Sequence, residues 1–247
     1  MRITKQVKLR KKLLLDNNIY NMTWKDITFE KYIDLMYFYE NIDQYADDLD
    51  KTIGLLVIFY SNIDIDELYS MPFIEVQEMV TPILGAIGNK IEYETLPYMN
   101  LEEMTYGEWI NLEIHIQNSD FQSIFDILYK ETKIDLSVNS PVEVLESYEA
   151  LIKYRNDIYS HFGDLFKMNG DDTIDPDETP EEREERLQIQ EENKNNSEWS
   201  WYLYTYDIAK GDITKFDEIF DKNHLFIFNI LHMKKKFKLN EVYRGVF

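Results

Sequence analysis

Apolar residues that recur at three- and four-residue intervals are the feature that most constrains the fold of this chain. The clearest pattern is Phe73, Val76, Met79, Val80, Ile83, Leu84 and Ile87. This spacing places the side chains on one stripe of an α-helix. Just upstream, residues 55–60 (LLVIFY) are apolar at every position, which predicts a segment buried on all sides. The sequence therefore predicts a mainly α, multi-helix bundle-like protein.

The starts of the predicted helices follow from residues that cap helix N-termini. Ser, Thr and Asp oxygens accept hydrogen bonds from the first amides of a helix, and a Glu three residues later completes a capping box. Thr105 with Glu108 and Asp64 with Glu67 have this spacing. The other predicted starts are Thr28, Asp48 or Asp50, Pro72, Ser119 or Asp120, Ser140 and Thr214. Pro82 lies inside the 73–87 pattern and predicts a kink or a break into two helices.

Composition narrows the class of protein and of partner. The 247 residues suffice for one large domain or two small ones. A formal net charge of -21 makes non-specific attraction to nucleic acid or anionic membranes unfavourable, so a neutral or basic protein surface is the expected partner. The chain has no cysteine, which excludes disulfides and cysteine-ligated metals. No apolar run approaches the ~20 residues of a membrane helix, so no membrane partner is expected.

Changes in composition divide the chain into four predicted parts. Residues 1–20 form a basic N-terminal arm, and residues 21–168 form a helical core domain. Residues 169–198 form an acidic, exposed and mobile insertion, because acids are dense there and apolar residues are few. A DNA-mimicking or cation-binding tract is the alternative for this insertion. Residues 199–247 form aromatic C-terminal helices that pack on the core or on a partner.

The basic arm has two interpretations. Six basic side chains stand there against one acid, Asp16, while Ile3, Val7 and Leu9 alternate loosely with polar residues. That alternation permits a short N-terminal β-strand or an extended tail. The arm either reaches onto nucleic acid or an acidic neighbouring protein, or folds back onto the acidic surface of its own chain. The second interpretation is preferred, and contact with nucleic acid is expected at most through this arm.

Candidate partner-binding residues lie in the aromatic C-terminal part and at the charged ends. Trp and Tyr are favoured at protein interfaces, and aromatic residues here exceed what one helical hairpin buries easily. The candidates are Trp199, Trp201, Tyr202, Tyr204, Phe226, Phe228, Lys234, Lys235, Lys236, Arg10, Lys11 and Lys12.

No arrangement of residues in the sequence predicts catalysis, a cofactor or a metal ion. His115 and His161 are isolated, and His224 and His232 are separated by eight residues with Phe228 between them instead of a third ligand, so structural roles are expected. The 8 glycines include no phosphate-binding motif. The enzyme alternative is a carboxylate-dependent hydrolase, which would need two acids converging in a concave pocket.

Several stretches carry a resemblance to known proteins. Residues 22–28 (MTWKDIT), 32–35 (YIDL) and 50–56 (DKTIGLL) look like small helical proteins of tailed bacteriophages. Residues 104–113 (MTYGEWINLE) resemble a phrase found among tail-assembly-chaperone-like proteins. The abundance of Asn, Ile, Tyr and Lys, with little Ala or Gly, is similar to virion proteins of crAss-like phages. The resemblance covers roughly the first 150 residues.

The resemblance implies a non-enzymatic protein that binds other phage proteins. The first expectation is a structural component of the head-to-tail connector or tail region, a ring or packaged protein found in the virion and, during assembly, in the host cytoplasm. Its partners would be portal, ring or tail proteins, or further copies of itself. The alternative is a tail assembly chaperone that shields tape-measure helices and is absent from the mature virion. An exposed apolar groove would favour the chaperone, whereas flat patches on opposite sides would favour the structural component.

Overall fold

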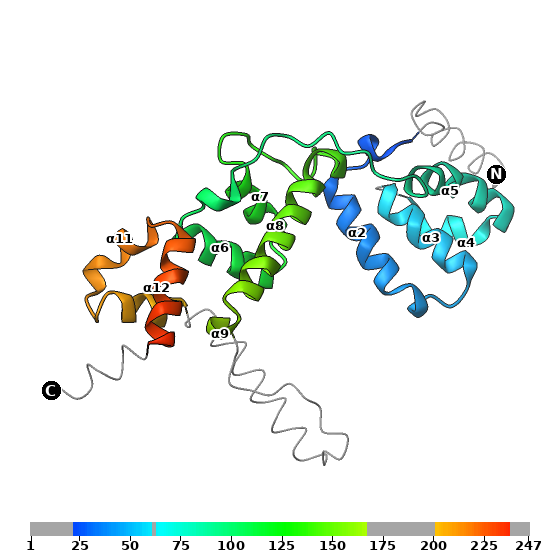
Figure 1. Ribbon diagram of the computed structural model, residues 1–247. Helices are drawn as coiled ribbons and strands as arrows, with labels where there is room; N and C mark the ends of the chain where they lie inside the picture. The colour runs from blue at the N-terminus through cyan, green and yellow to red at the C-terminus, as the bar shows by residue number, and fades with distance from the viewer. Residues whose placement is uncertain (1–21, 61–62, 167–200, 238–247) are drawn as a thin grey trace, which may run out of the picture. The chain divides into compact units, whose positions relative to one another are not determined.

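The computed structural model describes residues 22–60, 63–166 and 201–237, and these ranges are mainly helical (Figure 1). The predicted mainly α fold is confirmed. Within these ranges there is no strand, and the β pairing is an isolated antiparallel bridge between Thr105 and Asn223. The basic arm with its predicted β element and the acidic insertion 169–198 lie outside the described residues.

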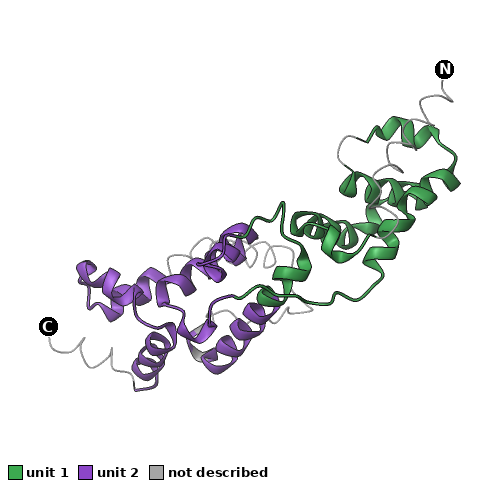
Figure 2. Cartoon of the chain, turned by 90° about the horizontal axis from the view of Figure 1, so that it is seen from above, with its two compact units in different colours: residues 1–97, 134–148 green, residues 98–133, 149–247 purple. Residues whose placement is uncertain are grey.

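The chain forms two compact units, each built from separate segments (Figure 2). Unit 1 comprises residues 1–97 and 134–148, and unit 2 comprises residues 98–133 and 149–247. The predicted core domain 21–168 is thus divided between the units, while the C-terminal helices belong to unit 2. Composition does not change at these boundaries, so no compositional signal marks the division.

Unit 1 is organised around α3 (Asp48–Phe59), which packs against α2 (Phe29–Glu40), α4 (Ile65–Ser70) and α5 (Phe73–Ile87). Short 3-10 helices precede and follow α2: η2 (Trp24–Asp26) and η3 (Ile42–Gln44). The core includes the buried side chains of Leu35, Phe38, Ile53, Leu55, Leu56, Phe59, Val76, Val80 and Ile83. Each such side chain contributes about 1.5–3 kcal/mol when it is fully buried.

Helix α5 confirms the helix predicted for residues 73–87 but corrects two expectations. Val76, Val80, Ile83 and Ala86 form its buried stripe, whereas Phe73 and Leu84 of the predicted stripe are exposed. The helix continues through Pro82, so the predicted break into two helices is wrong. Proline inside a helix costs about 3 kcal/mol, and burial of apolar side chains on both sides of Pro82 offsets that cost.

Residues 134–148 complete unit 1 although they are distant in sequence. The amides of Phe29 and Glu30, at the start of α2, donate to the carbonyls of Asn139 (2.7 Å) and Leu136 (3.0 Å). The amide of Glu94 likewise donates to the carbonyl of Val142 (2.9 Å), near the start of α8 (Pro141–His161). This segment therefore supplies backbone acceptors to amides that local structure leaves unpaired.

Unit 2 packs its helices around an aromatic interior. Its elements are η4 (Leu101–Glu103), α6 (Tyr106–Gln117), α7 (Phe121–Leu128), the second part of α8, α9 (Gly163–Phe166), helical residues 201–208, η5 (Ile213–Lys215), α11 (Phe216–Phe220) and α12 (His224–Lys236). Tyr106, Trp109, Trp201 and Phe228 are buried among them. The predicted capping box is confirmed, because the Glu108 amide donates to Thr105 Oγ1 (3.2 Å) and the Thr105 amide donates to Glu108 Oε2 (2.9 Å).

The final helix predicted from Thr214 is two helices, α11 and α12, preceded by η5. Asp212, not Thr214, provides the cap of η5 by accepting from the Thr214 amide (3.1 Å). The break follows α11, where the Tyr106 amide donates to the carbonyl of Lys222 (2.7 Å) and the His224 amide donates to the carbonyl of Met104 (3.2 Å). These tertiary bonds take backbone groups that one continuous helix would use.

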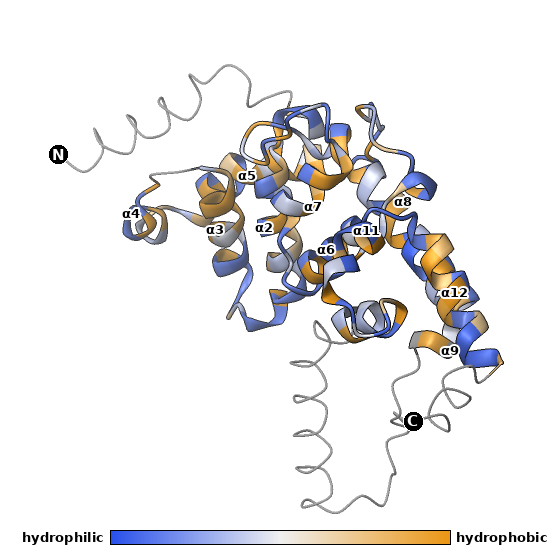
Figure 3. Cartoon of the chain, turned by 90° about the vertical axis from the view of Figure 1, so that its left-hand side faces the viewer, coloured by the Kyte–Doolittle hydropathy of each residue, from blue (hydrophilic) through white to orange (hydrophobic). Residues whose placement is uncertain are grey.

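Hydrophobic and hydrophilic residues are interspersed along the helices of both units (Figure 3). Within the described part of the chain, no helix combines the length and the apolar character that crossing a membrane requires.

Candidate functional site

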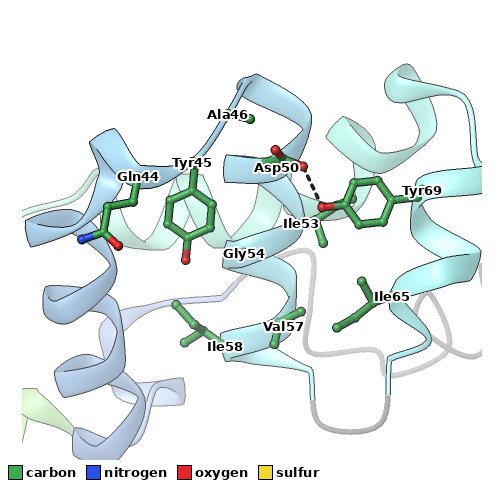
Figure 4. A pocket seen from close by; sticks show the side chains of 10 residues that line it. All are labelled: Gln44, Tyr45, Ala46, Asp50, Ile53, Gly54, Val57, Ile58, Ile65 and Tyr69. Atoms are coloured by element: carbon green, nitrogen blue, oxygen red, sulfur yellow. Dashed lines mark hydrogen bonds between the residues drawn. The ribbon is translucent and has the colours of Figure 1, made fainter.

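An open groove of about 480 Å³ lies in unit 1, between α3 and two neighbouring segments (Figure 4). Its floor is a stripe of α3, and its walls come from the end of η3 and from α4. The lining residues are Gln44, Tyr45, Ala46, Asp50, Ile53, Gly54, Val57, Ile58, Ile65 and Tyr69. Most of them are apolar or aromatic, which is typical of a site that binds an apolar surface.

One face of α3 packs into the core of unit 1, and another forms the floor of the groove. Leu55, Leu56 and Phe59 point into the core, whereas Val57 is 42% exposed on the groove side. The groove-lining residues of α3 recur at one- and three-residue steps, which places them on one side of the helix: Asp50, Ile53, Gly54, Val57 and Ile58. The prediction that residues 55–60 are buried on all sides is therefore wrong at Val57.

The α4 wall presents Ile65 and Tyr69, which are one helical turn apart and exposed by 45% and 50%. Asp64 fixes the start of this helix, because its side chain accepts from the amide of Glu67 (3.2 Å). The predicted Asp64 start is thus confirmed. One turn of exposed apolar surface here faces the exposed Val57 of α3 across the groove (Figure 4).

A hydrogen bond joins the two sides of the groove. The Tyr69 hydroxyl donates to Asp50 Oδ1 (2.6 Å), which ties α4 to the first turn of α3. This bond to a carboxylate, together with the nearby negative charge, raises the pKa of the Tyr69 phenol. Asp50 is also the one carboxylate among the lining residues, whereas the hydrolase alternative requires two converging acids.

Gly54 allows the η3 side of the groove to approach α3 closely. A Cβ at this position would lie 2.7 Å from Phe38 Cε2 and 2.9 Å from Tyr45 Cε1. The rings of Phe38 and Tyr45 are themselves in contact, with centroids 4.9 Å apart. The absence of a side chain at Gly54 therefore lets this aromatic pair pack directly on the helix.

The surroundings of the groove are strongly acidic. Residues 41–70, which contribute every lining residue, include seven acids and one basic residue, Lys51. Asp50 lines the groove, Asp43 and Asp47 flank the η3 wall in sequence, and Asp66 follows Ile65 beside the exposed stripe of α4. These four acids are called the acidic rim. An apolar floor with an acidic rim is complementary to an apolar ligand that carries basic side chains at its edges.

The aromatic candidates of the C-terminal part divide between interior and surface. Trp201 and Phe228 are buried within unit 2, with ring centroids 6.1 Å apart. These two side chains are core residues, so they do not form an exposed contact surface. Tyr204 is half-buried and donates its hydroxyl to the Leu165 carbonyl (3.0 Å), whereas Tyr202 and Phe226 are exposed.

The basic candidates are also unlike one another. Lys234 forms an ion pair with Asp207 inside unit 2 (2.6 Å), which gives it a structural role. Lys235 and Lys236 are exposed in the last turn of α12, where positive charge favours the helix C-terminus. Trp199, Arg10, Lys11 and Lys12 lie outside the described residues.

His224 is a buried structural residue of unit 2. Its Nδ1 lies 2.8 Å from the Met104 carbonyl and its Nε2 lies 2.8 Å from the Tyr154 hydroxyl. A carbonyl can only accept, so Nδ1 carries the proton and Nε2 accepts from Tyr154. The ring also stacks on Trp109, with centroids 5.3 Å apart. Burial lowers the pKa of His224 and raises the pKa of Tyr154 to about 12.

The described ranges contain no cluster of His and acidic residues that could hold a metal ion. Glu113, the buried acid of unit 2, accepts two hydrogen bonds from the Arg155 guanidinium (2.8 and 2.9 Å) and one from the Tyr159 hydroxyl (2.9 Å). Its oxygens are therefore satisfied by a charged partner and a phenol, as a buried carboxylate in a structural role requires.

Comparisons with protein-family models, with curated proteins and with solved structures gave no match to this chain.

The groove is the candidate site that the sequence did not identify. Its residues come from a stretch whose uniform apolar character predicts complete burial, and a periodic pattern cannot show which face of such a helix is left uncovered. The available signal was composition: seven acids within residues 41–70 flank the most apolar run of the chain.

Proposed function

We propose that this protein is a non-enzymatic binding protein of a tailed bacteriophage, and that its groove holds an amphipathic helix of another phage protein. The observation that carries the proposal is the groove itself, in which Val57, Ile65 and Tyr69 expose apolar surface. Amphipathic helices bind such grooves through apolar residues spaced three and four apart. The phage setting rests on the resemblance of residues 22–56 and 104–113.

Between the two phage roles, the groove supports the assembly chaperone. A chaperone must shield an apolar helical stripe before assembly, and a groove with an apolar floor is suited to that task. The structural component of the connector or tail remains the second candidate. Support for it comes from exposed apolar side chains on unit 2, namely Tyr202, Leu203, Tyr206, Ile213, Phe226, Met233 and Phe237.

Co-expression with the tape-measure protein of the same phage tests the groove. We expect the wild-type chain to keep the tape-measure protein soluble and the Val57→Lys variant to lose most of that effect, because a charged side chain would occupy the apolar floor. The Val57→Lys variant should fold, since Val57 is 42% exposed. Ile74→Lys is the matched control, because Ile74 is a 63% exposed apolar residue of unit 1 that does not line the groove.

Each result has a defined meaning. If the wild-type chain and Ile74→Lys keep the partner soluble and Val57→Lys does not, the groove binds the helix. If Val57→Lys behaves like the control, the groove is not the site. If the wild-type chain itself has no effect, the chaperone role is wrong. Quantitative mass spectrometry then separates the two phage roles: a fixed ratio to the portal in purified particles indicates a structural component, and presence in lysate alone indicates a chaperone.

A further inference from the structure

We propose that the basic N-terminal arm, residues 1–20, is an internal ligand of the groove that a partner helix must displace. This inference rests on the proposed helix-binding role of the groove and adds a regulation to it. The groove and its acidic rim belong to the described part of unit 1, and the arm is the segment of the same unit that precedes residue 21.

Charge is the first observation in favour of this occupant. The arm carries six basic side chains against Asp16, whereas residues 41–70 carry seven acids against Lys51. The chain as a whole has a net charge of -21, so the positive charge of the arm is opposite in sign to that of the whole chain. Opposite charges on two surfaces steer them together and fix their register.

The apolar side chains of the arm are a second observation in favour of this occupant. In an extended arm, Ile3, Val7 and Leu9 share one face, and Arg2, Lys8 and Arg10 share the other. The arm therefore combines apolar and basic side chains, and the groove combines an apolar floor with an acidic rim. The two patterns are complementary in both respects.

The arm is long enough to reach the groove. An extended chain of 20 residues spans up to about 70 Å, while a compact unit of roughly 100 residues has a radius of gyration of about 13 Å. The arm can therefore reach every face of unit 1. A short tether gives an effective concentration on the order of 1 mM, so even a weak contact fills the groove in most molecules.

When the arm occupies the groove, the apparent affinity of the groove for an external helix falls. If the arm fills the groove in about nine of ten molecules, removal of the arm strengthens binding of an external helix about tenfold. The arm would thus keep the apolar floor covered until a partner with a stronger apolar stripe is present.

Paramagnetic relaxation in the full-length protein tests the contact. The chain has no cysteine, so Gln6→Cys provides a single site for a nitroxide label in the arm. We expect the label to broaden the methyl signals of Ile53 and Ile65 in the groove and to leave the methyl signals of Ile74 sharp. The Val57→Lys change should abolish the broadening, whereas Ile74→Lys should retain it. Equal broadening of all three isoleucines, or none, would contradict the proposal.

A mixed sample separates the arm of the same molecule from that of a second copy. Broadening in a mixture of spin-labelled chains and separately isotope-labelled chains would assign the contact to a second copy and overturn the internal ligand. A designed 18-residue helix of Leu and Lys, used as the external probe, separates this inference from the proposed function. If Val57→Lys abolishes binding of the probe but deletion of residues 2–20 does not strengthen it, the proposed role of the arm is refuted and the proposed function of the groove stands. Absence of probe binding even to the deletion variant refutes both.

Discussion

His224 shows how one buried side chain can link the stability of unit 2 to pH. The ring contacts the Met104 carbonyl, the Tyr154 hydroxyl and the stacked indole of Trp109. Protonation of Nε2 would turn an acceptor into a donor and would place a charge in an apolar interior. Burial of the ring lowers the pKa of His224, and this effect exceeds the opposite effect of the hydrogen bond to the Met104 carbonyl.

We expect acid to destabilise the protein through His224. The unfolded histidine has a pKa of about 6.5 and the folded one a lower pKa, so the unfolded state binds more protons below that pH. Stability is therefore complete above about pH 6.5, falls by up to about 1.4 kcal/mol per pH unit below it, and levels off below the folded pKa. Urea unfolding at about pH 7.5 and pH 5.5 measures the loss.

The variant His224→Asn should lack this part of the pH dependence. His161→Asn is the control, because His161 is exposed at the end of α8. If His224→Asn loses as much stability on acidification as the wild type does, another group is responsible.

At the scale of elements, the close packing of α3 against Phe38 and Tyr45 predicts opposite effects for two similar substitutions. Gly54→Ala places a methyl within 3 Å of both rings, which costs about 1–3 kcal/mol and exceeds the gain of about 1 kcal/mol in helix propensity. We expect Tm to fall by about 4 °C. Gly85→Ala in α5 meets no atom within 4 Å and should raise Tm. Thermal unfolding followed by circular dichroism measures both, and a rise in both variants would contradict the close approach.

The starts of the helices could be predicted from the sequence, whereas their continuity could not. Thr28, Asp64 and Thr105 cap helices as predicted, because each bond joins residues three apart and needs no tertiary information. Continuity through Pro82 and the break after Phe220 were not predictable, because burial and long-range backbone bonds decide them. The groove escaped prediction for a related reason: nothing local distinguishes Val57 from its buried neighbours.

At the scale of the whole molecule, the two units interleave in sequence, since residues 98–133 of unit 2 separate the two segments of unit 1. We expect a chain that ends at Lys133 to protect the start of α2 less than a chain that ends at Tyr148, because the acceptors at Leu136 and Asn139 are missing. Hydrogen exchange of peptides covering residues 24–40 measures this. Equal exchange rates in the two chains would show that α2 does not depend on the later segment.

Because the two units interleave in sequence, the parts of unit 1 are synthesised at different times. Helices α3 and α4 and the groove between them are synthesised before residue 71, so their short-range contacts can form early. The backbone acceptors of residues 134–148 appear only after more than thirty residues of unit 2 have been made. The nascent chain therefore exposes an apolar groove well before the unit that carries it is complete. The basic arm precedes the groove in the chain, so it has been synthesised by then and is available to cover the groove.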